Sequence, residues 1–224
     1  KAELNGQTSQ TAAPAAPASD GTKGDASGIN HAVGRTEFVG TAIGDTIGLV
    51  IASVDPMLKD SMKLGKFRSI GIIGGRTGAG PQIMAVDDAV KATNTEVISV
   101  ELPRDTKGGA GHGSLIIIGA EDVSDARRAV ETALQAVPKY FGDVYGNDAG
   151  HLEFQYSARA SYCLEKALGA KFGKAFGMTC AGPAAIGVVL ADTAVKAANV
   201  EVVGYSSPGN GGTSFSNEVI LCFS

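Results

Sequence analysis

Short apolar runs alternate with amphipathic stretches along the chain, and this pattern predicts both buried strands and helices. In the first half, residues 47–54, 69–73, 96–101 and 115–118 have the composition of strands. Between them, one stripe has helical i, i+3, i+4, i+7 spacing, formed by Val86, Ala89, Val90 and Thr93. A longer stripe comprises Val123, Ala126, Val130, Ala133, Leu134 and Val137. The first half therefore predicts a mixed domain of class α/β (α+β).

The second half predicts the same order of elements. Residues 152–156, 176–180, 201–205 and 218–223 are expected strands. Two helical stripes lie between them: Ala160, Cys163, Leu164 and Ala167, then Ala191, Ala194, Val195 and Ala198. No counterpart of the long helix of the first half follows the last strand, so we expect an apolar sheet face to be exposed there unless another segment covers it.

Local signals predict where two of the helices begin and end. Asp55 followed by Pro56 is a favourable N-cap and first helical residue for a short helix that runs to about Leu64. Gly169 is expected to stop the helix that begins near Ala160.

A direct repeat shows that the two halves are copies. DDAVKATNTEV at 87–97 and DTAVKAANVEV at 192–202 share eight of eleven positions at an offset of 105 residues. The sequence therefore predicts a tandem duplication, with one domain at 36–140 and another at 141–224 that lacks the last helix. Residues 1–35, rich in Ala, Ser, Thr, Gly and Pro, are expected to be a disordered extension, either a loose terminus or a tether for cargo.

Composition narrows the classes of function. The net charge of −4 without a basic cluster argues against nucleic acid as a partner. No apolar run of 18 residues occurs, and the N-terminus lacks the pattern of a signal peptide, so we expect no membrane span and a cytoplasmic location. Cys163, Cys180 and Cys222 lie in separate apolar stretches and are expected to be buried free thiols.

No local motif predicts catalysis, a cofactor or a metal. His31, His112 and His151 form no HExxH motif, and no Cys or carboxylate stands at metal-ligand spacing from them. A nucleophile and base that meet only in space remain open. GGRTGAGP at 74–81 lacks the GK[ST] ending of a phosphate loop, so a tight strand-to-helix turn is favoured. An α/β enzyme or a tandem-domain small-molecule sensor that uses this turn is the alternative function.

Two Gly-rich loops stand at the same place in each copy. They span residues 103–113 and 206–217, whereas a hairpin needs only about two to five residues there. Their tips are polar, and glycine lets backbones crowd together, as when several copies converge on an axis. Flexible surface loops would have the same composition, so both interpretations stay open.

These segments carry a family resemblance that covers residues 37–224. RSIGIIGG and ADTAVKAANVEVVGYSSPGNGGTSFSNEVIL resemble the shell domains of bacterial microcompartments. The stretches EFVGTAIGDTIGLVIASVD and YGNDAGHLEFQYSARASY resemble the tandem-domain shell proteins of propanediol utilisation. The resemblance implies two circularly permuted domains with ferredoxin-like antiparallel sheets and flanking helices. It also implies a structural protein without enzymatic activity or cofactor.

The same resemblance implies an assembly and its site residues. Three chains would form a pseudo-hexagonal homotrimer that tiles with hexameric shell proteins around the enzymes of a cytoplasmic compartment, and residues 1–35 would contact those enzymes. The loops would line pores for small metabolites, namely polyols such as 1,2-propanediol or glycerol. The implied pore residues are Pro103, Asp105, Thr106, Gly109, His112, Gly113, Ser206, Ser207, Asn210, Gly211, Thr213, Ser214 and Asn217. Lys91, Asn94, Lys196 and Asn199 are the implied lateral contacts.

Overall fold

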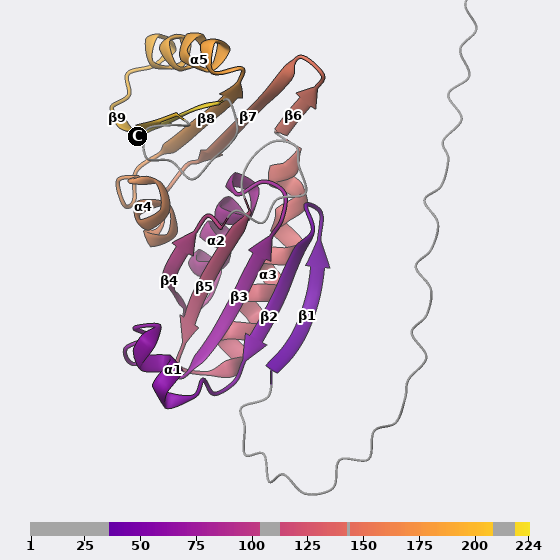
Figure 1. Cartoon of the computed structure of the whole chain (residues 1–224). Helices are drawn as coiled ribbons and strands as arrows, with labels where there is room; N and C mark the ends of the chain where they lie inside the picture. Colours follow the sequence, from indigo (N-terminus) through magenta and orange to yellow (C-terminus); the bar gives the residue numbers. More distant parts are fainter. Residues whose placement is uncertain (1–35, 104–112, 143, 208–217) are drawn as a thin grey trace, which may run out of the picture. The chain divides into compact units, whose positions relative to one another are not determined.

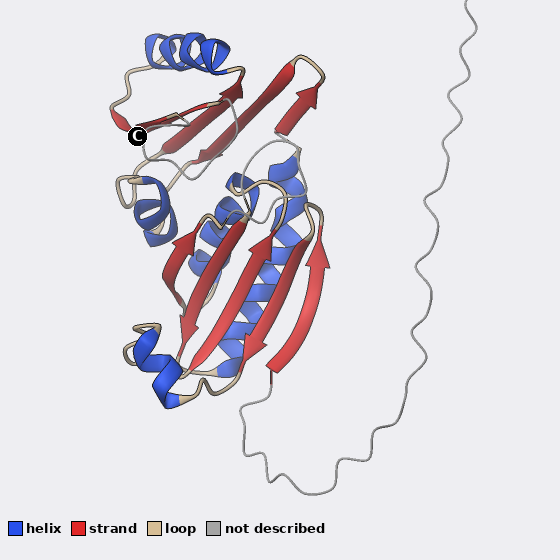
Figure 2. Cartoon of the chain, in the orientation of Figure 1, coloured by secondary structure: helices blue, strands red, loops and turns tan. Residues whose placement is uncertain are grey.

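The computed structural model describes residues 36–103, 113–142, 144–207 and 218–224, which form fifteen helices and strands (Figures 1 and 2). The first copy contains β1 (Thr36–Ala42), β2 (Thr46–Ile51), α1 (Pro56–Ser61), β3 (Ser69–Gly75), α2 (Gly80–Ala92), β4 (Glu96–Glu101), β5 (Ser114–Ala120) and α3 (Val123–Phe141). The second contains β6 (Val144–Asn147), β7 (Gly150–Ser157), α4 (Tyr162–Leu168), β8 (Phe176–Gly182), α5 (Ala184–Ala197), β9 (Val202–Ser206) and β10 (Val219–Phe223).

Each copy builds one five-stranded antiparallel sheet, and the two sheets have the same strand order. The first runs β1-β2-β3-β5-β4 and the second β6-β7-β8-β10-β9. Their pairings also correspond, since β3 pairs with β5 from Gly75–Ser114 to Ser69–Ala120, and β8 pairs with β10 from Ala181–Val219 to Gly177–Phe223. The predicted duplication and the α+β fold are therefore confirmed.

The local signals for the start of α1 and the end of α4 are confirmed as well, although α1 ends at Ser61 and not near Leu64. The Asp55 carboxylate accepts a hydrogen bond from the backbone N–H of Met57 at 2.9 Å, and α1 begins at Pro56. Gly169 caps α4 in the left-handed conformation, with φ of 70°. The 74–81 segment is the predicted turn, since β3 ends at Gly75 and α2 begins at Gly80.

Two strands, β1 and β6, were missing from the sequence prediction. Each forms an edge of its sheet. Both consist mostly of exposed or half-buried residues. An edge strand with little buried surface needs no apolar run, so its pairing with the next strand is what defines it.

Helix α3 lies along one face of the first sheet, contacts β1, β2, β3 and β5, and also packs on α2 (Figure 1). Glycine on β2 permits this close approach. A Cβ built on Gly48 would stand 2.6 Å from Val130 Cγ1 and 2.7 Å from Leu134 Cδ1. At Gly48, α3 thus packs directly against the backbone of β2, because glycine has no side chain.

Gly48→Ala is expected to lower the free energy of unfolding by about 1–3 kcal/mol, because the added methyl overpacks the contact with α3. Gly74→Ala on the neighbouring strand is the matched control, since its Cβ would meet nothing closer than 3.7 Å. Urea denaturation of both variants measures the difference. If the two variants had equal free energies of unfolding, α3 would be able to move and accommodate the added methyl group without loss of stability.

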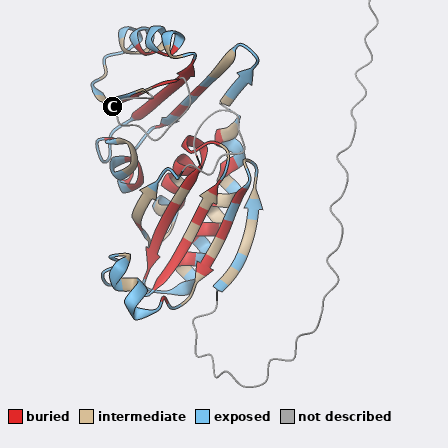
Figure 3. Ribbon diagram, viewed as in Figure 1, coloured by how far each residue is buried: buried red, intermediate tan, exposed pale blue. Residues whose placement is uncertain are grey.

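The corresponding helix of the second copy has no such cover among the described residues. Helix α5 is largely exposed, whereas α2 is largely buried (Figure 3). Val188 and Val189 of α5 are 48% and 62% exposed, but Ile83 and Met84 at the equivalent positions of α2 are only 2% and 1% exposed. The difference arises because α2 packs against α3. On β7, Leu152, Phe154 and Tyr156 are also exposed.

The main core includes side chains from both copies. Met84 and Val86 of α2 belong to the same cluster of buried residues as Leu164 of α4 and Phe176 and Met178 of β8. No helix in the described parts of the chain is both long and apolar enough to span a membrane.

Candidate functional site

The two Gly-rich loops begin and end on equivalent hairpins. Antiparallel β4 and β5 flank the first, with Glu101 opposite Leu115, and β9 and β10 flank the second, with Ser206 opposite Ile220. Equivalent hairpins of the two sheets therefore carry both loops. Most of the predicted pore residues lie outside the described residues: Asp105, Thr106, Gly109, His112, Asn210, Gly211, Thr213, Ser214 and Asn217.

Four predicted pore residues at the loop bases are described. Pro103 and Ser206 are exposed, Ser207 is half-buried, and Gly113 is buried beside β5. Pro103 lies two residues after β4, and Ser206 is the last residue of β9. The pore assignment as a whole stays a prediction.

The helix lysines, equivalent in sequence, have different surroundings. Lys196 donates to the Asp192 carboxylate at 2.6 Å one helical turn away, and its side chain is 72% exposed. Lys91 donates to the Asp87 carboxylate and to Ser157 Oγ of the second copy, the latter at 3.0 Å, and its side chain is 32% exposed. Lys196 is therefore the more accessible of the two for a contact at the edge.

Both asparagines assigned to lateral contacts are exposed. Asn94 follows α2 and Asn199 follows α5, each three residues beyond the lysine of its copy. Both side chains are therefore accessible for the predicted lateral contacts.

Asp87 joins the two copies, a role that sequence reasoning missed. Its carboxylate is fully buried. It accepts hydrogen bonds from the Ser161 backbone N–H at 2.8 Å, from Ser161 Oγ and from Ser157 Oγ at 3.2 Å, in addition to Lys91. Ser161 is also the N-cap of α4, so one carboxylate connects α2 of the first copy to β7 and α4 of the second. The repeat included Asp87, but no pattern in the sequence distinguished it from Asp192.

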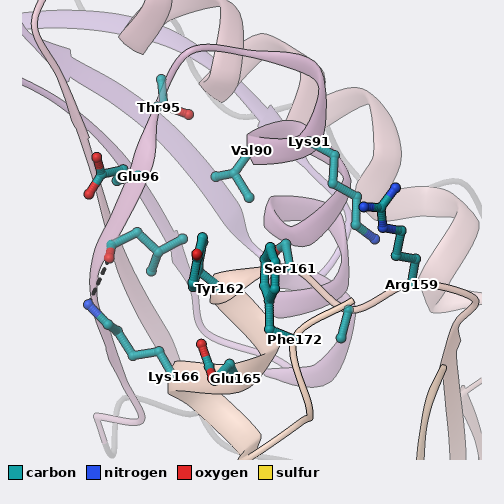
Figure 4. A pocket seen from close by; sticks show the side chains of 12 residues that line it. Val90, Lys91, Thr95, Glu96, Arg159, Ser161, Tyr162, Glu165, Lys166 and Phe172 are labelled. Atoms are coloured by element: carbon teal, nitrogen blue, oxygen red, sulfur yellow. Dashed lines mark hydrogen bonds between the residues drawn. The ribbon is translucent and has the colours of Figure 1, made fainter. Parts of the chain in front are cut away.

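A cleft of about 990 Å³ lies beside this junction, between residues 90–97 of the first copy and residues 159–172 of the second (Figure 4). Lys166 donates to the backbone carbonyls of Val97 and Ile98 at 2.8 and 2.9 Å and thereby ties α4 to β4. The rings of Tyr162 and Phe172 stack with centroids 4.1 Å apart. At this cleft, Lys166 thus connects the two copies.

Three potential metal ligands also meet in space although no local spacing predicted them. His151, Cys180 and Glu218 lie on or beside β7, β8 and β10, and their ligand atoms are all within 4.8 Å of one another. Burial, together with the nearby Glu218 and Glu153 carboxylates, raises the pKa of the Cys180 thiol far above its usual range. The Cys180–His151 pair is therefore not an activated nucleophile.

All three cysteines are buried and free, as predicted. Burial raises the pKa of the Cys222 thiol to about 12, and the pKa of the Cys163 thiol is raised further for the same reason. Both behave as apolar packing groups of the core.

Comparisons with known proteins agree with this arrangement. The family model of the BMC domain matches residues 69–148 and 175–224. Bacterial microcompartment shell protein PduB of Salmonella typhimurium is 70% identical over 190 residues, which cover 84% of this chain and 70% of that protein.

Solved structures show the same fold. EtuB from Clostridium kluyveri has a TM-score of 0.80 at 59% identity, over 84% of this chain and 82% of that one. A trimeric bacterial microcompartment shell protein PduB has a TM-score of 0.79 at 54% identity, over 84% and 83% of the two chains.

Two sheets of one topology, each with a matched BMC segment, define a tandem-domain shell protein. The chain belongs to the bacterial microcompartment shell protein family and is a structural subunit of that shell. Because the relatives of this chain are structural shell proteins, we reject the hypothesis that it is an α/β enzyme.

Proposed function

We propose that three chains form a pseudo-hexagonal disc that tiles with other shell proteins and carries pores for small polyols. The observation that carries the proposal is the pair of sheets with one topology, because three chains then supply six similar units. A relative of 54% identity is described as a trimeric shell protein, which supports the same stoichiometry.

The domain limits belong to this proposal. Residues 36–140 and 141–224 are the two shell domains, and residues 1–35 are an extension that contacts encapsulated enzymes. An Ala-, Ser- and Pro-rich segment of this kind has too little apolar surface for a core of its own, which leaves it available for a partner.

The selectivity of the pore follows from hydrogen bonding. A polyol hydroxyl both donates and accepts, whereas an aldehyde carbonyl only accepts. Loops that present Asp105, His112 and Asn210 offer acceptors to such hydroxyls in both copies. A polyol such as 1,2-propanediol or glycerol is thus favoured over the corresponding aldehyde.

The double variant Asp105→Ala, Asn210→Ala is expected to weaken binding of 1,2-propanediol or glycerol about tenfold, the loss of one or two hydrogen bonds. Isothermal titration calorimetry measures the affinity. Asp60→Ala, which removes an exposed carboxylate from α1, is the control. Binding to the double variant that equals the wild type would exclude these loops as the polyol site.

Lateral assembly depends on Lys196 in this proposal. Lys196→Ala is expected to abolish flat arrays in negative-stain electron microscopy and to leave the native mass at the 67.8 kDa of three 22.6 kDa chains. The reason is that Lys196 is largely exposed and bound only within its own helix turn in the described structure.

Lys174→Ala, at an exposed lysine of the segment before β8, is the control and should still form arrays. Lys91→Ala is measured separately, since Lys91 also contacts Asp87 and Ser157 and its loss alters the fold itself. Arrays of normal appearance from Lys196→Ala would disprove the lateral role of this residue. A wild-type protein that never tiles would favour the sensor hypothesis.

A further inference from the structure

Three side chains of different chemistry converge on one face of the second sheet. His151 Nε2 lies 2.9 Å from Glu218 Oε2 and 3.9 Å from Cys180 Sγ. The residues stand on β7, on β8 and directly before β10, which are adjacent strands. Cys180 is 4% and Glu218 1% exposed, and the His151 side chain is 16% exposed. The group is therefore buried and opens to solvent only beside the imidazole.

The distances agree with those of a tetrahedral zinc site. With Zn–N and Zn–O bonds of about 2.0–2.1 Å and a Zn–S bond of about 2.3 Å, ligand atoms stand about 3.3–3.6 Å apart. The observed His151–Glu218 and His151–Cys180 separations bracket that range. All three ligand atoms lie within 4.8 Å of one another, so side-chain rotations would bring them onto one ion.

Charge and ligand type favour the same ion. Binding of the ion displaces the proton of the Cys180 thiol to solvent. The resulting thiolate, a neutral imidazole and a carboxylate carry a combined charge of −2, which a divalent cation cancels inside the protein. Thiolate and imidazole prefer zinc and similar transition metals, whereas Mg²⁺ and Ca²⁺ require oxygen ligands. A transition-metal ion with an affinity for both sulfur and nitrogen therefore matches these three side chains.

The first copy provides an internal comparison. The corresponding corner of the first sheet, at the starts of β2 and β5 and near the end of β3, holds Thr46, Ser114 and Ile73. There, Gln82 Nε2 donates to Thr46 Oγ1 at 2.9 Å. The same place in the fold thus holds neutral groups and an aliphatic side chain in one copy and three metal-ligating groups in the other. The fold itself does not require ligands at this place.

We propose that His151 Nε2, Cys180 Sγ and the Glu218 carboxylate form a site for one divalent transition-metal ion, with zinc as the preferred ion. Water completes the tetrahedron from the side where the imidazole is exposed. Binding crosslinks β7, β8 and the start of β10, and it fixes the point at which the chain returns from the second Gly-rich loop. The inference does not depend on the trimer, the pore or the tiling proposed above.

The test uses the full chain after treatment with a chelator and desalting. Zn²⁺ is titrated calorimetrically, and Co²⁺ serves as a spectroscopic probe because a thiolate ligand produces a near-ultraviolet charge-transfer band. The expected results are one ion per chain, a thiolate–cobalt band, and a rise in Tm when Zn²⁺ is added.

Cys180→Ala is expected to abolish the charge-transfer band and the rise in Tm. Cys222→Ala, which removes a buried free thiol on the neighbouring strand, should retain both. His151→Gln is the second test, because Gln preserves a polar partner for Glu218 and removes the imidazole ligand. Circular dichroism establishes that each variant is folded.

Failure of the wild-type chain to bind Zn²⁺ or Co²⁺ would overturn the proposal. So would a charge-transfer band that persists in Cys180→Ala, because the ion would then be held at another thiol. Binding by Cys180→Ala and His151→Gln with wild-type affinity would place the ion elsewhere and refute the assignment equally.

Discussion

Asp87→Ala is expected to lower the free energy of unfolding by roughly 3 kcal/mol, one of the two largest effects that the structure predicts. The carboxylate is fully buried and is bound by Lys91, Ser157 and Ser161. Its removal leaves the buried Ser161 N–H without this acceptor and separates a cation from its counterion. The loss also removes the hydrogen bonds from Ser161, at the start of α4, to α2.

The repeat supplies a matched control for this variant. Asp192→Ala removes the equivalent aspartate of the second copy, whose side chain is 57% exposed and binds Lys196 one helical turn away. An exposed pair of this kind contributes little, so the expected change is below about 0.5 kcal/mol. Urea denaturation at one protein concentration measures both variants. Similar losses for the two would mean that Asp87 does not hold the copies together.

Glu153→Gln is expected to raise the free energy of unfolding by about 3 kcal/mol above pH 7 and to leave it nearly unchanged below pH 4.5. Burial, with a smaller contribution from the Glu218 charge, raises the pKa of the Glu153 carboxyl from 4.5 to about 7, although the hydrogen bond from Gln155 acts in the opposite direction. The uncharged amide avoids the cost of a buried charge. It also keeps an oxygen that accepts from Gln155 Nε2, which donates to Glu153 at 3.1 Å in the wild type.

The direction of the pH dependence follows from linkage. Between pH 4.5 and 7 the unfolded chain loses the Glu153 proton while the folded chain retains it, so this residue makes the wild type less stable as pH rises. The advantage of Glu153→Gln should therefore grow through this window and reach a plateau above pH 7.

Denaturation curves at several pH values, with a chelator present to keep the nearby His151 group free of metal, measure this effect. Glu165→Gln on α4 changes an exposed carboxylate and should show no such window. An advantage of Glu153→Gln that is the same at pH 4 and pH 8 would contradict a raised pKa in the folded state.

Most of the fold could be predicted because its signals are local. The N-cap at Asp55 and the stop at Gly169 depend on residues adjacent to the helix ends, and both are observed. Buried strands such as β3 and β5 have continuous apolar runs. Strands β1 and β6 could not be predicted in this way, because their pairing comes from a neighbouring strand and few of their residues are buried.

The candidate site was predictable only in part. The loops stand out by length and glycine content, and their hairpins are now seen to be equivalent. The roles of individual charged residues were not accessible from the sequence. Lys91 and Lys196 look identical within the repeat, yet only Lys91 reaches a side chain of the other copy.

By itself, the sequence determined that this protein is a duplicated α+β domain, because periodicity, caps and the two copies of the repeat can each be recognised in short stretches of chain. Its resemblance to a known family identified that domain as one of a microcompartment shell. Only the tertiary structure decided that Asp87 connects the copies and that His151, Cys180 and Glu218 meet. Residues 29 and 38 positions apart become neighbours only when β7, β8 and β10 pair side by side. The physical reason is that burial and proximity depend on sheet pairing and helix cover, which no local pattern specifies.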